Sequence, residues 1–424
     1  MNQILTACVA LFLMGPQYSM AQQPDGAGVA KSQTASSQAV TPPKSDAVQH
    51  ALALEQQGRF PEARAAWENV VRAQPRNAQA FAHLGLLEAR EERYADAIVH
   101  YRRAKLLNPN IPQLNLNLGL ALFKTGSFSE AAALFQAELR KHQPKSSGAI
   151  NPEVQRLTIL SGMSYYGAHD YNAAIPFLKK AAVEDPSNLP IRLTLAHCYL
   201  WTRQWDATMG IYKEILAINP RSAEADMIAG EALDEKGDSA GAIEQFRAAV
   251  QANSQEPDVH FGLAYLLWSQ KRYDEAVPEF NAELENDPKN YQAMIYLADT
   301  DVQQNQFLQA KDLLETAVRY QASVPLLHLD LGIVYSETGN RDAAIEEFNK
   351  AVKLEPDNVA AHFRLAKMYQ SMGKRDEAKA EFAKASSLNK KTDEGLYKRI
   401  AEASAGPDSD AGGTTPETTK PDNR

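Results

Sequence analysis

The chain has 424 residues, of which 44% are hydrophobic and 23% are charged, and its formal net charge at pH 7 is −9. This composition is that of a folded globular protein. The acidic balance argues against a surface that binds nucleic acid or an anionic membrane, because neutralising phosphates requires clustered lysine and arginine.

The first 21 residues differ from the rest of the chain. Residues 4–14, ILTACVALFLM, form an eleven-residue apolar run, which is too short to span a bilayer as a helix. Ser19 and Ala21 supply the small residues that a signal peptidase requires before Gln22. We therefore expect residues 1–21 to be a signal peptide, and the mature chain to be periplasmic or secreted without a transmembrane span.

The two cysteines bear on this expectation. The sequence LTAC at residues 5–8 resembles a lipobox, which would make Cys8 the acylated residue of a lipoprotein, although most of the apolar run follows it. After cleavage Cys198 would be the remaining thiol. No internal disulfide could then form, so stability would depend on packing.

Repeats of 34 residues occupy the region between two polar segments, residues 22–43 and 404–424, which are both expected to be disordered. Pro75 and Pro109 are 34 residues apart. Frames of this length give ten units, numbered here as repeats one to ten: 44–77, 78–111, 112–145, 155–188, 189–222, 223–256, 257–290, 291–324, 325–358 and 359–392. Position 20 of the frame is Ala in nine units, position 8 is Gly or Ala in all ten, and position 24 is aromatic in eight.

Each unit is predicted to form two helices. Small residues at positions 8 and 20, such as Gly85 and Ala97 in repeat two, would let the helices approach each other, and an aromatic residue at position 24, such as Tyr101, would fill the remaining space. Glycine at position 15 in five units favours a left-handed residue after the first helix. Proline at position 32 would stop the second helix.

This pattern resembles the tetratricopeptide repeat (TPR) and covers about 340 of the 424 residues. The resemblance implies an all-α fold, a right-handed α-solenoid of about ten helix-turn-helix repeats in which neighbours bury each other's apolar faces. Residues 393–403, with Leu396 and Ile400 on one face, are expected to form a C-terminal capping helix.

An insertion, residues 146–154, separates repeats one to three (44–145) from repeats four to ten (155–392). Such a segment is either a tolerated surface loop or a joint that divides the array.

Three acidic residues depart from the repeat pattern. Glu138 and Glu283 occupy position 27, which is usually small, and a carboxylate there must reach solvent or a partner. Asp301 replaces the usual tyrosine in repeat eight, and Ala322 replaces its proline. We expect local loosening of repeat eight.

None of the familiar catalytic motifs occurs in the sequence. His260, His328 and His362 share position 4, which is expected to lie at the edge of the core, and one histidine per repeat does not supply convergent metal ligands. Cys198 and His197 are helical neighbours whose side chains point about 100° apart, so they are not expected to form a catalytic dyad. We expect no enzymatic activity, no cofactor and no metal site.

In the TPR family the first helices line a concave surface, and the resemblance implies that positions 2, 5, 9, 12 and 13 face it. These positions are rich in apolar residues, with acidic residues in repeat six, and they predict a partner-binding groove. The candidate residues are Leu116, Leu120, Phe123, Ile159, Met163, Tyr166, Leu193, His197, Trp201, Glu231, Asp234, Phe261, Tyr265 and Trp268. The alternative is that position 5 and part of position 9 pack against the next repeat, which would leave Trp201 and Trp268 unexplained.

The resemblance and the groove together predict a non-enzymatic scaffold that captures a protein or peptide partner and is exported to the cell envelope. The alternative is a periplasmic accessory protein of polysaccharide assembly or secretion, with aromatic side chains that stack on sugars. Some family members bind carboxylate termini through Lys and Asn in the groove, but position 5 here is mostly aliphatic or aromatic and position 9 holds no Asn.

Overall fold

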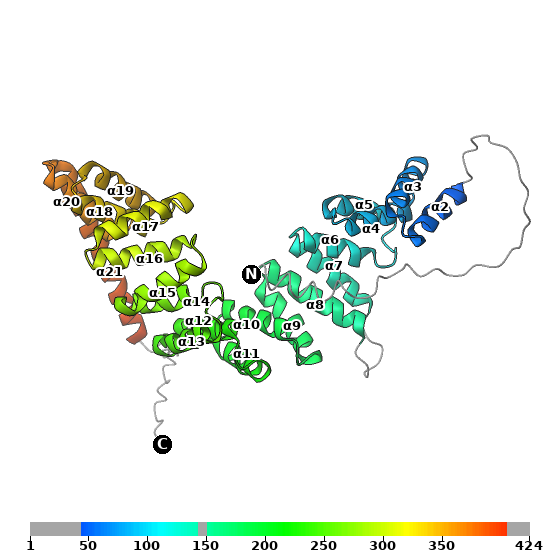
Figure 1. The fold of residues 1–424 in the computed structure, drawn as a ribbon, viewed down its shortest axis with the longest axis horizontal. Helices are drawn as coiled ribbons and strands as arrows, with labels where there is room; N and C mark the ends of the chain where they lie inside the picture. The colour runs from blue at the N-terminus through cyan, green and yellow to red at the C-terminus, as the bar shows by residue number, and fades with distance from the viewer. Residues whose placement is uncertain (1–43, 143–150, 405–424) are drawn as a thin grey trace, which may run out of the picture. The chain divides into compact units, whose positions relative to one another are not determined.

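The computed structural model describes residues 44–142 and 151–404, whose regular secondary structure is entirely helical (Figure 1). The predicted signal peptide (1–21), the predicted linker (22–43), most of the insertion (146–150) and the tail (405–424) lie outside the described residues. The helices pair into ten hairpins, one for each predicted frame. The predicted all-α repeat fold is therefore confirmed.

The chain divides into two compact units between Asn253 and Ser254. The N-terminal unit holds repeats one to six: α2 (Lys44–Gln56) and α3 (Phe60–Ala73), α4 (Ala78–Arg90) and α5 (Tyr94–Leu107), α6 (Leu114–Lys124) and α7 (Phe128–Lys141), α8 (Pro152–Gly167) and α9 (Tyr171–Glu184), α10 (Leu189–Trp201) and α11 (Trp205–Ile218), α12 (Ala223–Glu235) and α13 (Ser239–Ala252). The C-terminal unit holds repeats seven to ten: α14 (Val259–Ser269) and α15 (Tyr273–Asn286), α16 (Tyr291–Gln303) and α17 (Phe307–Tyr320), α18 (Pro325–Glu337) and α19 (Arg341–Leu354), α20 (Val359–Ser371) and α21 (Arg375–Ser404).

The insertion between repeats three and four lies inside the N-terminal unit. Helix α8 begins at Pro152, within the predicted insertion, because the Asn151 side chain accepts a hydrogen bond from the Glu153 N–H and proline suits the first helical turn. At the other end of α8, a Cβ on Gly167 would lie 2.8 Å from the Phe128 ring of α7. The two repeats are therefore tightly packed.

Small residues face aromatic rings inside the hairpins, as the sequence predicts. A Cβ added to Gly85 would lie 2.7 Å from the Tyr101 ring, and one added to Gly332 would lie 2.5 Å from the Phe348 ring. Real Cβ atoms do not approach so closely, so the aromatic side chain requires glycine at these two positions.

The residue at position 15 has a left-handed backbone conformation in all ten repeats. The predicted glycines have φ from 71° to 87°: Gly58, Gly126, Gly237, Gly339 and Gly373. The other five repeats place a residue with a Cβ there, with φ from 57° to 61°: Glu92, His169, Arg203, Lys271 and Asn305. Because this conformation costs such residues about 1–2 kcal/mol, the turn between the helices imposes it.

The predicted capping helix is not a separate element. Residues 393–403 continue α21, which runs from Arg375 to Ser404. Lys390 stands where six of the other repeats have a proline, so no proline blocks the continuation of the helix here. Within residues 44–142 and 151–404, no helix is both long and apolar enough to cross a membrane.

Candidate partner-binding site

Six of the fourteen candidate residues are buried in the N-terminal unit. Each is at most 7% exposed: Leu116, Phe123, Ile159, Met163, Tyr166 and Leu193. Ile159 and Leu193 share position 5, and their helices α8 and α10 contact each other. A partner would not reach these six residues in this structure. The burial of Leu116, Ile159, Met163 and Leu193 agrees with the alternative that positions 5 and 9 pack against the next repeat, whereas Phe123 and Tyr166 lie at position 12, which that alternative did not include.

Trp201 is different, because 62% of it is exposed at the last residue of α10. Its indole stacks on the ring of Tyr171, the first residue of α9, with ring centroids 6.1 Å apart and planes 16° apart. The Tyr171 hydroxyl lies 2.8 Å from Nδ1 of His169 in the preceding turn. The hairpin of repeat four thus holds the inner face of an indole whose outer surface is open to solvent.

The polar candidates of this unit lie on α10 and α12. His197, one turn before Trp201, is half-buried, and its Nε2 lies 3.3 Å from a carboxylate oxygen of Glu224 at the start of α12. Glu231 is exposed on α12, and half-buried Asp234 accepts a hydrogen bond from the Ser239 hydroxyl at 3.3 Å. The remaining apolar candidate of this unit, Leu120, is half-buried on α6.

The C-terminal unit contains a cluster of four rings, here called the C-terminal aromatic cluster: Phe261, Tyr265 and Trp268 from α14 and Tyr296 from α16. Trp268 contacts Tyr296 edge-on with centroids 4.7 Å apart, and it stacks on Tyr265 at 5.8 Å. Tyr265 is 38% exposed, while the other three rings are half-buried. Here the structure brings the predicted residues together at the surface.

One buried aspartate contacts this cluster, and a second lies on the next first helix. The Trp268 indole Nε1 donates a hydrogen bond to Asp299 Oδ2 at 2.7 Å, and the Gln303 amide donates to Asp299 Oδ1 at 3.2 Å. Asp330, on α18, is 1% exposed, and its Oδ2 has no hydrogen-bond partner. Burial, together with the nearby charge of Asp299, holds the pKa of Asp330 well above its ordinary value.

Sequence reasoning missed Tyr296, Asp299 and Asp330, although a signal for them existed. Tyr296 and Asp330 occupy position 6, which is three or four residues from positions 2 and 9 and therefore lies on the same helical stripe. Asp299 occupies position 9 itself.

The groups considered for chemistry have structural roles. Cys198 is buried, and burial raises the pKa of its thiol to about 12, so it is not a nucleophile at neutral pH. His260, His328 and His362 each place Nδ1 within 2.6 Å of a glutamate nineteen residues further on. No grouping of His, Cys, Asp and Glu in the described ranges could hold a metal ion.

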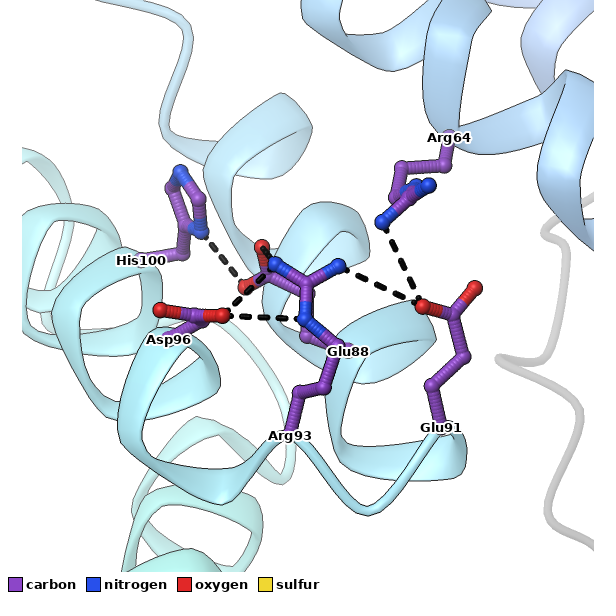
Figure 2. Close-up of polar contacts among 6 residues, drawn as sticks. All are labelled: Arg64, Glu88, Glu91, Arg93, Asp96 and His100. Atoms are coloured by element: carbon purple, nitrogen blue, oxygen red, sulfur yellow. Dashed lines mark hydrogen bonds and ion pairs between the residues drawn. The ribbon is translucent and has the colours of Figure 1, made fainter.

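Glu88 shows how the N-terminal unit accommodates an acidic residue at the packing position 11 (Figure 2). Its carboxylate lies 2.6 Å from His100 Nδ1 and 3.5 Å from the Arg93 guanidinium. Arg64 of repeat one pairs at 3.3 Å with Glu91, which also lies 3.4 Å from Arg93. This network joins repeats one and two, and its charges compensate each other.

The paired helices and small-to-aromatic contacts define the class of this protein, an α-solenoid scaffold built from stacked hairpins. Sequence models described as Tetratricopeptide repeat match residues 48–115, 104–149, 116–188, 210–257, 229–291, 165–232, 267–329 and 359–392, and a model described as TPR repeat matches residues 334–373. The chain belongs to the tetratricopeptide repeat family.

Several curated proteins are similar to this chain. It is 24% identical over 312 residues to the TPR repeat-containing protein MJ1428 of Methanocaldococcus jannaschii, covering 67% of this chain and 53% of that protein. It is 24% identical over 214 residues to BBSome complex member BBS4 of Bos taurus, covering 50% and 40%. It is also 24% identical over 317 residues to Cellulose synthase operon protein C of Xanthomonas axonopodis pv. citri, covering 68% and 20%. The chain thus spans about half or less of each relative.

Solved structures with a similar fold include that of Pseudomonas aeruginosa pilF, at 18% identity and a TM-score of 0.46, covering 51% of this chain and 97% of that one. Yeast Tom70 matches at 14% identity and a TM-score of 0.36, covering 87% and 97%.

Proposed function

We propose that this protein is a non-enzymatic scaffold that captures a partner polypeptide on the first-helix faces of its repeats. The observation that carries the proposal is the exposed Trp201 indole, held on one side by Tyr171 and open on the other. Tryptophan and tyrosine dominate the binding free energy of many protein interfaces, especially when rigid neighbours fix their orientation. The C-terminal aromatic cluster supplies a second surface of the same kind.

The test begins with cross-linking of the purified protein in envelope extract, identification of the captured proteins and purification of the leading partner. Trp201→Ala should weaken binding of that partner about 30-fold, because loss of a central aromatic anchor costs about 2 kcal/mol or more. Leu106→Ala is the matched control, since Leu106 is an apolar residue of a second helix and is 75% exposed. Equal losses for both variants would contradict the proposal.

We further propose that the chain is exported to the periplasm or secreted. Its support is the apolar run at residues 4–14 followed by Ser19 and Ala21, which lie outside the described residues. N-terminal sequencing of the protein from its own cells should give Gln22 as the first residue. A lipid-modified Cys8 would instead show a membrane-tethered form.

A second candidate function is support of polysaccharide assembly or secretion, favoured by the similarity to a protein named for a cellulose synthase operon. A stacked, exposed indole such as Trp201 also offers an apolar face to a sugar ring. Titration with cello-oligosaccharides, followed by tryptophan fluorescence, separates the two functions. Saturable quenching that disappears in Trp201→Ala would favour the sugar ligand, and no quenching would favour the polypeptide.

A further inference from the structure

Four side chains form a row across successive first helices of the C-terminal unit: Trp268 on α14, Asp299 on α16, Asp330 on α18 and Arg364 on α20. Each of these helices contacts the next. The Trp268 indole is hydrogen-bonded to Asp299, and Asp299 acts electrostatically on Asp330. Asp299 thus adjoins the C-terminal aromatic cluster, and Asp330 lies on the next first helix, α18, which contacts α16.

Neither carboxyl group of this row forms an ion pair with a cationic side chain in the described part of the chain. Asp330 is 1% exposed, and its Oδ2 accepts no hydrogen bond. Arg364 is exposed and acts on Asp330 through space, but it forms no ion pair with Asp330 in the described part of the chain. A buried carboxyl without a partner opposes folding, so packing alone does not explain the residue. Glu88 in repeat two, by contrast, is paired with His100 and Arg93.

The neighbouring rings favour a positively charged ligand. Tyr265 and Trp268 are stacked at 5.8 Å, Tyr296 contacts Trp268 edge-on, and Tyr265 is 38% exposed. Aromatic faces attract ammonium and guanidinium groups, and carboxylates bind the same groups through charge-assisted hydrogen bonds. An anionic ligand would lack these favourable contacts and would lie near the carboxyl group of Asp299.

We propose that this row binds one basic side chain, arginine or lysine, of an extended partner peptide. Asp299 and Asp330 are the counter-charges, and the rings of Tyr265, Trp268 and Tyr296 are the walls. The inference rests on the proposed function, since it names the chemistry of the polypeptide that the C-terminal unit recognises. Binding requires the side chains over Asp330 to rotate aside, and the Asp330 carboxyl then gives its proton to the buffer as the cation arrives.

The experiment uses the full chain and five degenerate nonapeptide libraries that differ only in a fixed central residue: arginine, lysine, citrulline, glutamine or glutamate. Capture of the arginine and lysine libraries should exceed that of the uncharged libraries at least about tenfold, because a buried charge-assisted contact distinguishes them. Citrulline matches arginine in shape without its charge, so equal capture of these two libraries would overturn the inference.

Asp330→Asn should remove the preference for basic peptides, while the chain stays folded, because asparagine has nearly the shape of the protonated carboxyl. Asp312→Asn is the matched control, since Asp312 is exposed on α17, and it should leave the preference unchanged. Arg364→Ala should strengthen capture, because it removes a competing cation. If Arg364 instead neutralises Asp330 within the protein, Arg364→Ala would lower stability and leave capture unchanged, which would also overturn the inference.

Calorimetry in two buffers of different ionisation enthalpy, with the best-bound arginine peptide and its citrulline counterpart, gives a second measurement. The arginine peptide should release protons on binding, and the citrulline peptide should release none. Capture that depends on Trp268 but not on central charge would sustain the proposed function and overturn this inference. If Trp268→Ala did not change capture, the result would contradict both this inference and the proposed function for the C-terminal unit.

Discussion

The Glu283 carboxylate of α15 accepts a hydrogen bond from the backbone N–H of Phe261, in the first turn of α14, at 3.1 Å. The residue before α14, Asp258, is left-handed and provides no side-chain cap, so the partner helix supplies the missing acceptor. The Asn290 amide donates to the other carboxylate oxygen at 3.1 Å. Glu138 repeats the arrangement in part, since it accepts from the Asn115 amide in the first turn of α6.

Glu283→Ala should therefore destabilise repeat seven by about 2–3 kcal/mol, because it removes the acceptor of the Phe261 N–H and leaves the Asn290 amide only its 3.4 Å contact with Asp258. Glu283→Gln retains one acceptor oxygen and should cost about 1 kcal/mol. Hydrogen exchange of amides in α14 and α15 measures both effects. Glu285→Ala, at an exposed position of the same helix, is the control and should change little. Equal effects of Glu283→Ala and Glu285→Ala would show that the carboxylate does not cap α14.

The contact between position 8 and position 24 leads to a second prediction. A Cβ on Gly230 would lie 2.6 Å from the Phe246 ring, so Gly230→Ala should overpack the hairpin and cost about 1–3 kcal/mol. Gly210, in α11 of the same unit, has no atom within 4 Å of the corresponding position, and Gly210→Ala should stabilise by about 0.5–1 kcal/mol. Urea unfolding followed by circular dichroism measures both, and changes of the same sign would contradict the steric explanation.

The left-handed turn at position 15 leads to a third prediction. Glu92, with φ of 59°, carries a Cβ into this region, so Glu92→Gly should raise stability by up to about 1 kcal/mol, after allowance for the greater freedom of glycine in the unfolded chain. Gly58→Ala, at φ of 71°, should lower it by about 1–2 kcal/mol. Thermal unfolding of the two variants gives the comparison. A loss of stability in Glu92→Gly would mean that the glutamate side chain contributes more than its backbone costs.

Most of the fold could be predicted because the contacts that define the TPR pattern are local. Gly85, Ala97 and Tyr101 meet within one hairpin, and equivalent contacts recur every 34 residues along the chain. The candidate site depends on contacts between repeats, which the frame of a single repeat does not show. Ile159 and Trp201 both occupy positions assigned to the groove, yet the first is buried against the next repeat and the second is exposed. Asp330 was missed because its importance comes from Asp299, one repeat earlier.

The His328 side chain leads to a fourth prediction, on pH. Its Nδ1 lies 2.6 Å from Glu347 and its Nε2 lies 2.8 Å from the Ala322 carbonyl oxygen, and both partners are acceptors, so the doubly protonated imidazolium fits the site. The hydrogen bond to Glu347 raises the pKa of His328 above its ordinary 6.5. The folded state therefore binds the proton more tightly than the unfolded chain. This contribution is fully present below pH 6.5 and is lost as pH rises through the raised pKa.

Replacing His328 tests this predicted pH dependence of stability. His328→Gln should cost about 1–2 kcal/mol at pH 6, and the cost should become smaller as pH rises through the raised pKa of the histidine. Urea unfolding between pH 5.5 and pH 9 measures the difference. His50→Gln, at an exposed position of α2, is the control for the general effect of exchanging a histidine for glutamine. A cost for His328→Gln that does not change with pH would mean that the neutral imidazole already makes the same contacts.

Asp301, which replaces the usual tyrosine in repeat eight, leads to the fifth prediction. Here stability should fall rather than benefit when the side chain is charged. The residue is 7% exposed, and burial raises the pKa of its carboxyl to about 6 from an ordinary 3.8. The folded state therefore favours the protonated form. Above pH 6 the ionised carboxylate lowers stability, and this penalty declines as pH falls through 6 and is absent below 3.8.

Asp301→Asn should accordingly stabilise repeat eight by about 1–3 kcal/mol at pH 7.5, and the gain should disappear near pH 4. Hydrogen exchange of α16 and α17 measures it and also tests the expected loosening of this repeat. Glu88→Gln is the matched control, because Glu88 occupies the same position 11 in repeat two but is paired with His100 and Arg93 (Figure 2). That substitution should lower stability, since it removes a compensated charge. If Asp301→Asn were also destabilising at pH 7.5, the carboxylate would have a partner that stabilises its charged form, and burial would not be the dominant effect at this position.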